Sequence, residues 1–388
     1  IVSANLSPET LLSDEDPVTE NEIHINNLRV IKPSVKKGFL PEVIEKLFVE
    51  RARYKKLMRT AHPESDEYKR YYSRQLALKT LLNGIYGQTA FVGSRIHAPW
   101  IADTITYTGR NLITWTHDLL DNVGLKVLYA DTDSAFVQVG TNNIEEIEKI
   151  RSLINGSYED FAKQYNIDKQ IFEIEFEKLY SKCFFSSVKK RYAGHVTYKG
   201  GQVTNTLDVT GFEIRRSDAP QFSRALQKRV FEMILKEDKN EDEVLRYVCG
   251  EIDRIRKGDF KFSEIGFPKG MTKELSEYSP VKEGGKLTAN IRAAQYSEDY
   301  LNVVLSSKPK MVYISKMPNG YPETDALSFD DDIQIPPGTQ IDVEKMLDKL
   351  IRSKLSSIFE ALGWNMGDLS YYWAGKAKPG GEQLRIEI

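Results

Sequence analysis

The sequence predicts an α+β fold, because helical and strand patterns both occur and lie in separate stretches of the chain. Two helical patterns, residues 41–58 and 65–86, come first and are joined by a short turn. A β-hairpin pattern follows at residues 126–139, and further strand-like residues lie at 171–177. From about residue 218 onwards the pattern is mainly helical. Strands segregated from helices in this way are typical of the α+β class.

The composition is that of an ordinary globular protein and argues against several other classes. A chain of 388 residues exceeds one compact core, so we expect two or three domains. With 40% hydrophobic residues and no apolar run long enough to span a bilayer, we expect neither disorder nor a membrane partner. Cys183 and Cys249 form no CxxC pair, which argues against a cysteine-ligated metal module. An intracellular protein is expected.

The first part of the chain predicts an extended segment followed by a helical hairpin. Residues 1–37 show no sustained period and contain several prolines. Apolar residues then recur at helical spacing across residues 41–58. Ser65 or Asp66 can cap a second helix, which we expect to run to about Tyr86. Two such helices joined by a short turn form an antiparallel pair.

This helical hairpin is unusually basic for a chain whose formal net charge is −2. Nine Lys or Arg residues and only three acidic residues lie between Arg51 and Lys79. Arg51 and Lys55 share a face of the first helix, and Lys79, Asn83 and Tyr86 share a face of the second. The cations could hold a triphosphate, and the tyrosine ring could lie flat under a base. The alternative is a cationic face covered only by water.

The β-hairpin carries two carboxylates one residue apart, Asp131 and Asp133. Residues at i and i+2 of an extended segment project to the same side, so these carboxylates could converge on one point. They would repel each other unless a cation lay between them. Mg²⁺ suits this role, because it takes oxygen ligands and typically uses one or two carboxylates together with substrate phosphates. The hairpin therefore indicates a metal site, and the alternative is an acidic turn that faces water.

A second basic cluster is the sequence Lys189-Lys190-Arg191-Tyr192, and no acidic residue occurs between Lys178 and this tyrosine. Its donors could contact phosphates and also minor-groove acceptors, which are nearly the same for every base pair. Binding of that kind would be independent of sequence. The alternative is an exposed basic patch without a ligand.

The remainder of the chain predicts helices whose apolar stripes belong to a core. Asp218 is expected to cap a helix that carries Phe222 and Val230 on one side. A later apolar stripe at residues 343–362 is closed by Gly363 as its C-terminal stop.

Three motifs occur in order: Lys79-x-x-x-Asn83-Gly84-x-Tyr86-Gly87, Tyr129-Ala130-Asp131-Thr132-Asp133-Ser134 and Lys189-Lys190-Arg191-Tyr192. In this order and spacing they resemble the motif series of the B-family DNA polymerases of archaeal and viral type. The resemblance covers almost the whole chain and corresponds to the carboxy-terminal portion of the family. It implies a right-hand architecture with an antiparallel-sheet palm, helical-hairpin fingers and a mainly helical thumb, without exonuclease and amino-terminal domains. The implied divisions are a palm entry segment at 1–40, fingers at 41–90, palm at 91–218 and thumb at 219–388.

The resemblance also implies a reaction and a set of site residues. Deoxynucleotides would be added to a primer 3′ end by nucleotidyl transfer with two Mg²⁺ ions. Asp131 and Asp133 would be catalytic and bind metal, with Glu177 as an accessory acid. The incoming nucleotide would be bound by Arg51, Lys55, Lys79, Asn83, Tyr86 and Gly87. The primer and template duplex would be contacted by Thr132, Lys189, Lys190, Arg191, Tyr192, Arg215 and Arg216.

Two features depart from the family pattern. Gly84 stands where the family commonly has Ser, and since Gly weakens a helix interior by about 1 kcal/mol we expect a local kink or a closer approach of a base. Residues 1–8 resemble those that immediately follow the family's first catalytic motif, Asp-x-x-Ser-Leu-Tyr-Pro-Ser. One principal metal ligand is therefore expected from an upstream polymerase segment, and the chain alone is expected to be inactive or incomplete.

Two other functions stay open: a non-catalytic DNA-binding remnant, and a metal-dependent phosphohydrolase built on the Asp131 hairpin. The expected partners are primer–template DNA, deoxynucleoside triphosphates and the upstream segment. The tail Gln383-Leu384-Arg385-Ile386 resembles sliding-clamp peptides without their paired aromatics, which makes a sliding clamp a further candidate partner. A cytoplasmic or nucleoid-associated place in a prokaryotic or viral setting is expected.

Overall fold

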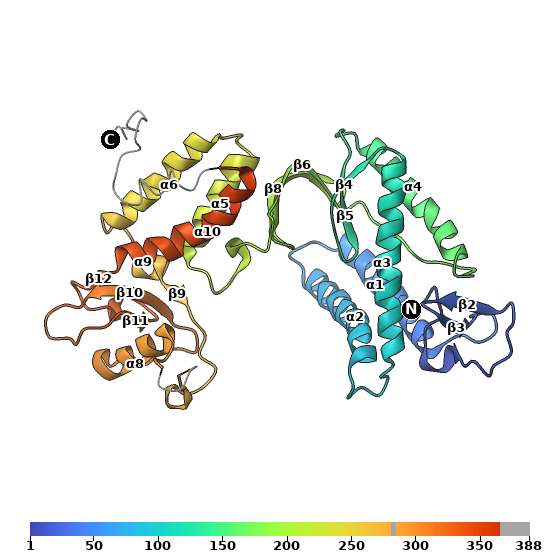
Figure 1. The fold of residues 1–388 in the computed structure, drawn as a ribbon, viewed down its shortest axis with the longest axis horizontal. Helices are drawn as coiled ribbons and strands as arrows, with labels where there is room; N and C mark the ends of the chain where they lie inside the picture. Colours follow the sequence, from blue (N-terminus) through green and yellow to red (C-terminus); the bar gives the residue numbers. More distant parts are fainter. Residues whose placement is uncertain (281–284, 365–388) are drawn as a thin grey trace. The chain divides into compact units, whose positions relative to one another are not determined.

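The computed structural model describes residues 1–280 and 285–364 (Figure 1). The chain separates into two units, Ile1–Phe176 and Glu177–Ile388, and each has its own hydrophobic core. Helices and antiparallel sheets occur in both, as an α+β fold requires. The four-part division into palm entry, fingers, palm and thumb stays a prediction. The tail at 383–386 lies outside the described residues.

The first unit combines a small antiparallel sheet, long helices and a β-hairpin. Its elements in chain order are a 3₁₀ turn at Pro8–Thr10, β1 (Leu11–Leu12), β2 (Glu22–Ile25), β3 (Leu28–Ile31), α1 (Phe39–Thr60), α2 (Asp66–Ala90), α3 (Pro99–Asn122), β4 (Lys126–Asp131), β5 (Ser134–Gln138) and α4 (Ile144–Lys163). The strands β1, β3 and β2 pair in that order. Asn26 and Asn27 connect β2 to β3 with positive φ, which two-residue hairpin loops favour and which Asn tolerates.

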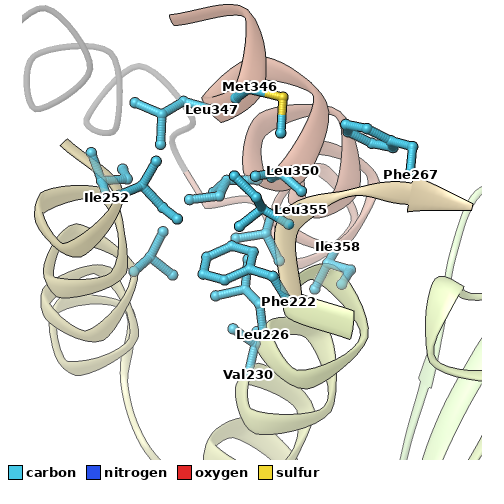
Figure 2. Packing of buried hydrophobic residues seen from close by; sticks show 14 of the residues in the cluster. Phe222, Leu226, Val230, Ile252, Phe267, Met346, Leu347, Leu350, Leu355 and Ile358 are labelled. Atoms are coloured by element: carbon cyan, nitrogen blue, oxygen red, sulfur yellow. The ribbon is translucent and has the colours of Figure 1, made fainter. Parts of the chain in front are cut away.

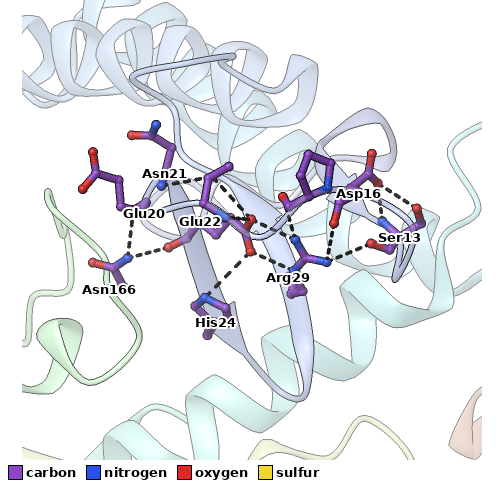
Figure 3. Close-up of polar contacts among 10 residues, drawn as sticks. Ser13, Asp16, Glu20, Asn21, Glu22, His24, Arg29 and Asn166 are labelled. Atoms are coloured by element: carbon purple, nitrogen blue, oxygen red, sulfur yellow. Dashed lines mark hydrogen bonds and ion pairs between the residues drawn. The ribbon is translucent and has the colours of Figure 1, made fainter.

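Figure 3 shows a buried carboxylate that ties this sheet to the chain before it. Glu22 of β2 is 1% exposed and accepts hydrogen bonds of 2.8 Å from both Nε and Nη2 of Arg29 on β3. Arg29 also donates to the carbonyl oxygens of Ser13, Asp16 and Pro17. The hydrogen bonds from Arg29 outweigh the effect of burial and lower the pKa of Glu22 to about 2. One ion pair therefore holds three backbone carbonyls against the sheet.

The helices α1 and α2 form the expected antiparallel hairpin. Ser65 caps α2, with its Oγ accepting a 3.1 Å hydrogen bond from the backbone N–H of Tyr68, which confirms the predicted start. The rings of Tyr54 and Tyr71 meet across the pair, with centroids 6.2 Å apart. At Gly84 the helix continues without a break, and an added Cβ would meet nothing within 4 Å.

Helix α3 contacts α2, β4 and α4, and so connects most parts of the first unit. Ile101 near its start is buried in the cluster that includes the N-terminal sheet. Leu120 near its end is buried together with Tyr158 of α4. Val127 and Val137 of the β-hairpin pack on that second cluster. The hairpin is therefore supported by α3 and α4.

The expected strand at 171–177 does not form a ladder, although alternate side chains are half-buried. The N–H of Ile174 donates to Oδ1 of Asn155 on α4 at 2.8 Å, and its carbonyl accepts from Nδ2 of the same side chain at 3.0 Å. One side-chain amide thus satisfies the backbone where a neighbouring strand was expected.

The second unit contains two antiparallel sheets and the helices of a larger core. Its described elements are β6 (Lys178–Phe185), β7 (Tyr192–Lys199), β8 (Gln202–Thr210), a 3₁₀ turn at Glu213–Arg215, α5 (Gln221–Leu235), α6 (Glu241–Arg256), α7 (Phe262–Ile265), β9 (Phe267–Pro268), a 3₁₀ turn at Leu275–Glu277, α8 (Ala289–Leu301), β10 (Lys310–Lys316), β11 (Ala326–Phe329), a 3₁₀ turn at Asp332–Gln334, β12 (Gln340–Ile341), α9 (Val343–Leu347), a π-helical turn at Asp348–Arg352 and α10 (Ser353–Leu362).

Figure 2 shows how the predicted apolar stripes of this unit meet. Phe222 and Val230 lie along one side of α5 and are buried together with Leu350 and Leu355 of the C-terminal helical stretch. Gly363 ends that stretch in the left-handed conformation, with φ of 69°, which confirms the predicted stop.

The predicted cap of α5 is wrong. Pro220 stands at its N-cap position, and no side chain caps it. The Asp218 carboxylate is instead held by Arg216, whose Nε and Nη2 donate to it at 2.9 and 2.7 Å. A charged partner two residues away competes well with a neutral backbone N–H, because charge-assisted hydrogen bonds are the stronger ones.

None of the helices within residues 1–280 and 285–364 combines the length and the apolar character needed to cross a bilayer.

The Glu22–Arg29 pair predicts a pH dependence of stability. Because the pKa of Glu22 is lower in the folded chain than the ordinary 4.5, its ionised form stabilises the fold fully above about pH 4.5, and this stabilisation is lost as the pH falls towards about 2. Glu22→Gln should flatten this dependence of the melting temperature, measured by circular dichroism. Glu20→Gln, which leaves the Arg29 hydrogen bonds in place, is the control. An unchanged acid profile in Glu22→Gln would contradict the assignment.

Candidate active site

The β4–β5 hairpin presents the two candidate carboxylates at a tight turn. Asp131 pairs with Ser134 at the end of the ladder, so Thr132 and Asp133 form a two-residue loop. Thr132 has φ of 60°, which is strained for a β-branched residue. Asp131 is half-buried, whereas Thr132 and Asp133 are exposed. Strained backbone of this kind persists where the surrounding structure determines it, often at functional sites.

Hydrogen bonds within the turn hold the backbone around Asp131. Its carbonyl accepts from the N–H of Asp133 at 2.7 Å and from Oγ of Ser134 at 3.2 Å. Its Oδ1 accepts from Oγ1 of Thr132 at 3.1 Å. The argument from strand alternation does not apply here, because Asp133 lies in the loop and not in an extended segment.

The chemistry of this donor set fits a hard cation. Two carboxylates one residue apart supply the oxygen ligands that Mg²⁺ takes, and one or two of them commonly suffice when phosphates complete the shell. Among the residues that the structure describes, no group of three or more His, Cys, Asp or Glu side chains is arranged to hold a metal ion. The hairpin therefore supplies two carboxylates of the type that such a site uses, and a metal site here stays a prediction.

The cation face is the set of Arg51 and Lys55 on α1 with Lys79, Asn83 and Tyr86 on α2. The seam between the two helices is marked by the contact of Tyr54 with Tyr71. Successive residues of a helix are rotated by about 100° around its axis. Counted in this way, the α1 residues of the face are rotated away from Tyr54 in the same direction as the α2 residues are rotated away from Tyr71. In an antiparallel pair this places them on the same side. The α1 cations are half-buried, and the α2 residues are exposed.

Few groups of the protein compete with a ligand for the cations of this face. In the described parts of the chain, no carboxylate lies within ion-pair distance of Arg51, Lys55 or Lys79. The Nε of Arg51 is buried and has no hydrogen-bond partner there. A buried donor without a partner costs about 1–3 kcal/mol, which an anionic ligand could offset. Gly87 follows Tyr86, is exposed, and would place an added Cβ in open space.

In the second unit, the basic cluster forms the turn between β6 and β7. The N–H of Ser186 donates to the carbonyl of Arg191 at 3.0 Å and closes this turn. Lys190 has φ of 62°, and Gly211, with φ of 77°, lies against it. A Cβ at position 211 would overlap the Lys190 carbonyl oxygen. Only glycine therefore fits beneath this turn.

The side chains of the basic cluster differ in their surroundings. Lys189 and Lys190 are exposed. The Arg191 guanidinium lies over the ring of Phe212 at 5.8 Å. The ring of Tyr192 packs beside Phe185, with centroids 6.3 Å apart. The aromatic neighbours thus orient two of the four side chains of this cluster.

The other predicted site residues of this unit differ in their exposure and in their ion-pair partners. Arg215 is exposed. Arg216 is held by Asp218, and this contact lowers the pKa of Asp218 to about 2. Glu177 is exposed, with Oε1 3.5 Å from Nζ of Lys178. The hairpin carboxylates and the cation face therefore belong to the first unit, while the basic cluster, both arginines and Glu177 belong to the second.

Sequence reasoning missed a polar cluster on the β6–β8 sheet. Asp208 accepts hydrogen bonds from Nζ of Lys178 at 2.8 Å and from the hydroxyl of Tyr180 at 2.7 Å. Burial raises the pKa of Asp208, but these two partners outweigh it and bring that pKa below its ordinary value. Burial and the Asp208 contact raise the pKa of Tyr180. The sequence carries no local signal for this cluster, because register alone brings the three residues together.

The Gly211 contact predicts that Gly211→Ala displaces the Lys189–Arg191 turn. We expect a loss of about 1–3 kcal/mol in the free energy of unfolding, because alanine is strained at this φ and its Cβ meets a carbonyl. Urea unfolding measures the loss, and tryptic cleavage at Lys189 and Lys190 should become faster. Gly250→Ala, inside α6 with open space around its Cβ, is the matched control and should lose nothing. Equal behaviour of the two variants would rule the contact out.

Comparison with known proteins supports one family. The family model for DNA polymerase family B matches residues 1–362. A DNA polymerase of Archaeoglobus fulgidus is 29% identical over 381 residues, which cover 95% of this chain and 45% of that protein. DNA polymerase 2 of Aeropyrum pernix is 29% identical over 283 residues, covering 72% of this chain and 32% of that protein.

A solved structure shows the same fold. The family B DNA polymerase from Pyrobaculum calidifontis superposes with a TM-score of 0.64 at 24% identity, and the match covers 92% of this chain and 43% of that one. The chain thus spans less than half the length of these relatives. Because the family model extends over most of the sequence, the chain belongs to DNA polymerase family B.

Proposed function

We propose that this chain takes part in template-directed DNA synthesis as the carboxy-terminal part of a family B polymerase. In this proposal α1 and α2 are the fingers, the β4–β5 hairpin belongs to the palm, and the helices of the second unit form the thumb. The observation that carries the proposal is the cation face, where the buried Nε of Arg51 has no hydrogen-bond partner in the described residues. The same unit holds the carboxylates of Asp131 and Asp133, which are one residue apart. A protein that only bound DNA would need neither feature.

The cation face would bind the triphosphate of the incoming deoxynucleotide. Arg51, Lys55 and Lys79 would hold its phosphates, because each lacks a competing carboxylate in the described residues. Asn83 and Tyr86, followed by Gly87, would line the nascent base pair, where the exposed ring offers a flat apolar surface. Movement of the helical hairpin onto the nucleotide would exclude water and support selection of the correct base.

The carboxylates of Asp131 and Asp133 would hold Mg²⁺, with Glu177 as an accessory acid. The ions, when bound, would activate the primer 3′ hydroxyl and stabilise charge at the transferred phosphate. A further carboxylate ligand for these ions would come from an upstream segment with the motif Asp-x-x-Ser-Leu-Tyr-Pro-Ser. Asp131 would orient its carboxylate through the hydrogen bonds that hold its backbone in the turn.

The primer–template duplex would be held mainly by the second unit. Lys189 and Lys190 would contact phosphates, while Arg191 and Tyr192, oriented by aromatic neighbours, would face the minor groove. Thr132 and Arg215 would add contacts, and Arg216 would do so only by leaving Asp218. Such contacts are independent of sequence, as a replicating enzyme requires.

The cation face predicts that Lys79→Ala weakens nucleotide binding. Loss of one charge-assisted hydrogen bond should raise the dissociation constant for a fluorescent deoxynucleoside triphosphate with Mg²⁺ about ten- to a hundredfold. Lys46→Ala on α1, where the lysine pairs with Glu42, is the control and should bind as the unchanged chain does. Equal affinities of the two variants would remove the triphosphate assignment.

The carboxylates predict that synthesis needs Asp131. Primer extension is measured with Mg²⁺ and deoxynucleotides, using this chain alone and mixed with a separately made segment that carries the upstream motif. We expect activity only in the mixture, and at least a hundredfold loss in Asp131→Asn, about the cost of losing one charge-stabilising group. The exposed Asp103→Asn on α3 is the control. Extension that survives Asp131→Asn would sink the proposal, and DNA binding without extension in either sample would favour a non-catalytic remnant.

A further inference from the structure

The tip of the α1–α2 hairpin carries an aromatic and basic surface that the proposed nucleotide site does not use. Two tyrosines one helical turn apart, Tyr68 and Tyr72, stack with ring centroids 6.4 Å apart and planes 11° from parallel. Tyr72 is 46% exposed, although a tyrosine is usually more covered. One side of its ring is therefore open to a further planar group.

These rings continue the α2 stripe towards the tip. At about 100° per residue, Tyr68 and Tyr72 lie on the same face of α2 as Lys79, and two to three turns nearer the helix start. The contact between Tyr54 and Tyr71 places Tyr72 level with the part of α1 between Arg51 and Lys55, and it places Arg59 nearer the tip. The tip rings and the cation face thus form one continuous strip along the hairpin.

Two cations lie on the tip side of the open ring. Arg59 lies one turn beyond Lys55 on α1, is exposed, and has no ion-pair partner in the described residues. Lys69 lies one turn before Tyr72 on α2, and its Nζ is 3.3 Å from Asp66. Both side chains of that pair are so exposed that the contact contributes little. The exposed Arg53, by contrast, lies about 260° from Tyr54 around α1 and so faces away from the strip, with its Nη1 3.6 Å from Oε1 of Glu50.

We propose that this tip surface binds single-stranded nucleic acid, with Tyr72, backed by Tyr68, stacking on an unpaired base and with Arg59 and Lys69 holding phosphates. Stacking platforms flanked by cations are the general device for binding single strands without sequence preference. A duplex fits poorly, because its bases are already stacked and cannot reach a ring on a convex helix pair.

The test uses the full chain and a fluorescein-labelled oligothymidine of about 12 nucleotides, a length within the usual range for such sites. Binding is followed by fluorescence anisotropy. Tyr72→Leu should raise the dissociation constant about tenfold, because it removes a stacking ring. Tyr72→Phe keeps the ring and should stay within about twofold of the unchanged chain. A blunt duplex, measured in parallel, should bind equally to all three proteins.

The charge contribution has its own readout and a matched control. For Arg59→Ala, the slope of log affinity against log salt for the oligothymidine should fall by about 0.7, the value for one phosphate contact on a single strand. Arg53→Ala removes the same side chain from the opposite side of α1 and should leave the slope unchanged. Since all three substituted side chains are exposed, the variants should keep the helical circular dichroism signal.

The proposal is overturned if Tyr72→Leu binds the oligothymidine as tightly as the unchanged chain. It is also overturned if Tyr72→Leu and Tyr72→Phe lose the same affinity, or if the blunt duplex is weakened as much as the single strand. Equal slopes for Arg59→Ala and Arg53→Ala would overturn the assigned phosphate contact. None of these measurements depends on nucleotide binding or synthesis. A failure here is thus distinguishable from a failure of the polymerase function, which is tested through Lys79 and Asp131.

Discussion

The first unit depends on the packing of α3. Its start buries Ile101 with the N-terminal sheet, and its end buries Leu120 with α4, while its flank contacts α2 and β4. A two-stranded hairpin alone is marginally stable in water, so Val127 and Val137 need the surface that α3 and α4 provide. The same helix therefore sets the places of the hairpin carboxylates and of the cation face within the unit.

The charge of the chain is small in sum but unevenly placed. Many ion pairs are local contacts along one helix, such as Lys46 with Glu42 and Arg151 with Glu148. On α1 and α2, by contrast, the basic residues between Arg51 and Lys79 far outnumber the acidic ones, and several have no partner in the described residues. Local fields of this kind attract polyanions even when the net charge is near zero. The net charge of −2 therefore does not describe the local field around this helical hairpin.

Both turns that carry candidate motifs hold a residue in an unfavourable conformation. Thr132 closes the β4–β5 turn and Lys190 the β6–β7 turn, each with positive φ. The pairing of Asp131 with Ser134 holds the β4–β5 turn in its conformation. Gly211 has no side chain and so leaves room for the β6–β7 turn. Strain at these turns is sustained by the ladders on either side, which places polar side chains at defined points.

The sequence by itself determined the elements whose signals are local, and the family. Helical spacing and the Ser65 cap predicted α1 and α2, and strand-favouring residues around two aspartates predicted the hairpin. Three motifs in order identified the family, since order along a chain needs no knowledge of contacts. The tertiary structure decided the rest. The amide of Asn155 satisfies Ile174 in place of a strand, and Gly211 lies under Lys190, because residues far apart in sequence came within hydrogen-bond or contact distance. Propensity describes single residues and their near neighbours, so it cannot supply such contacts.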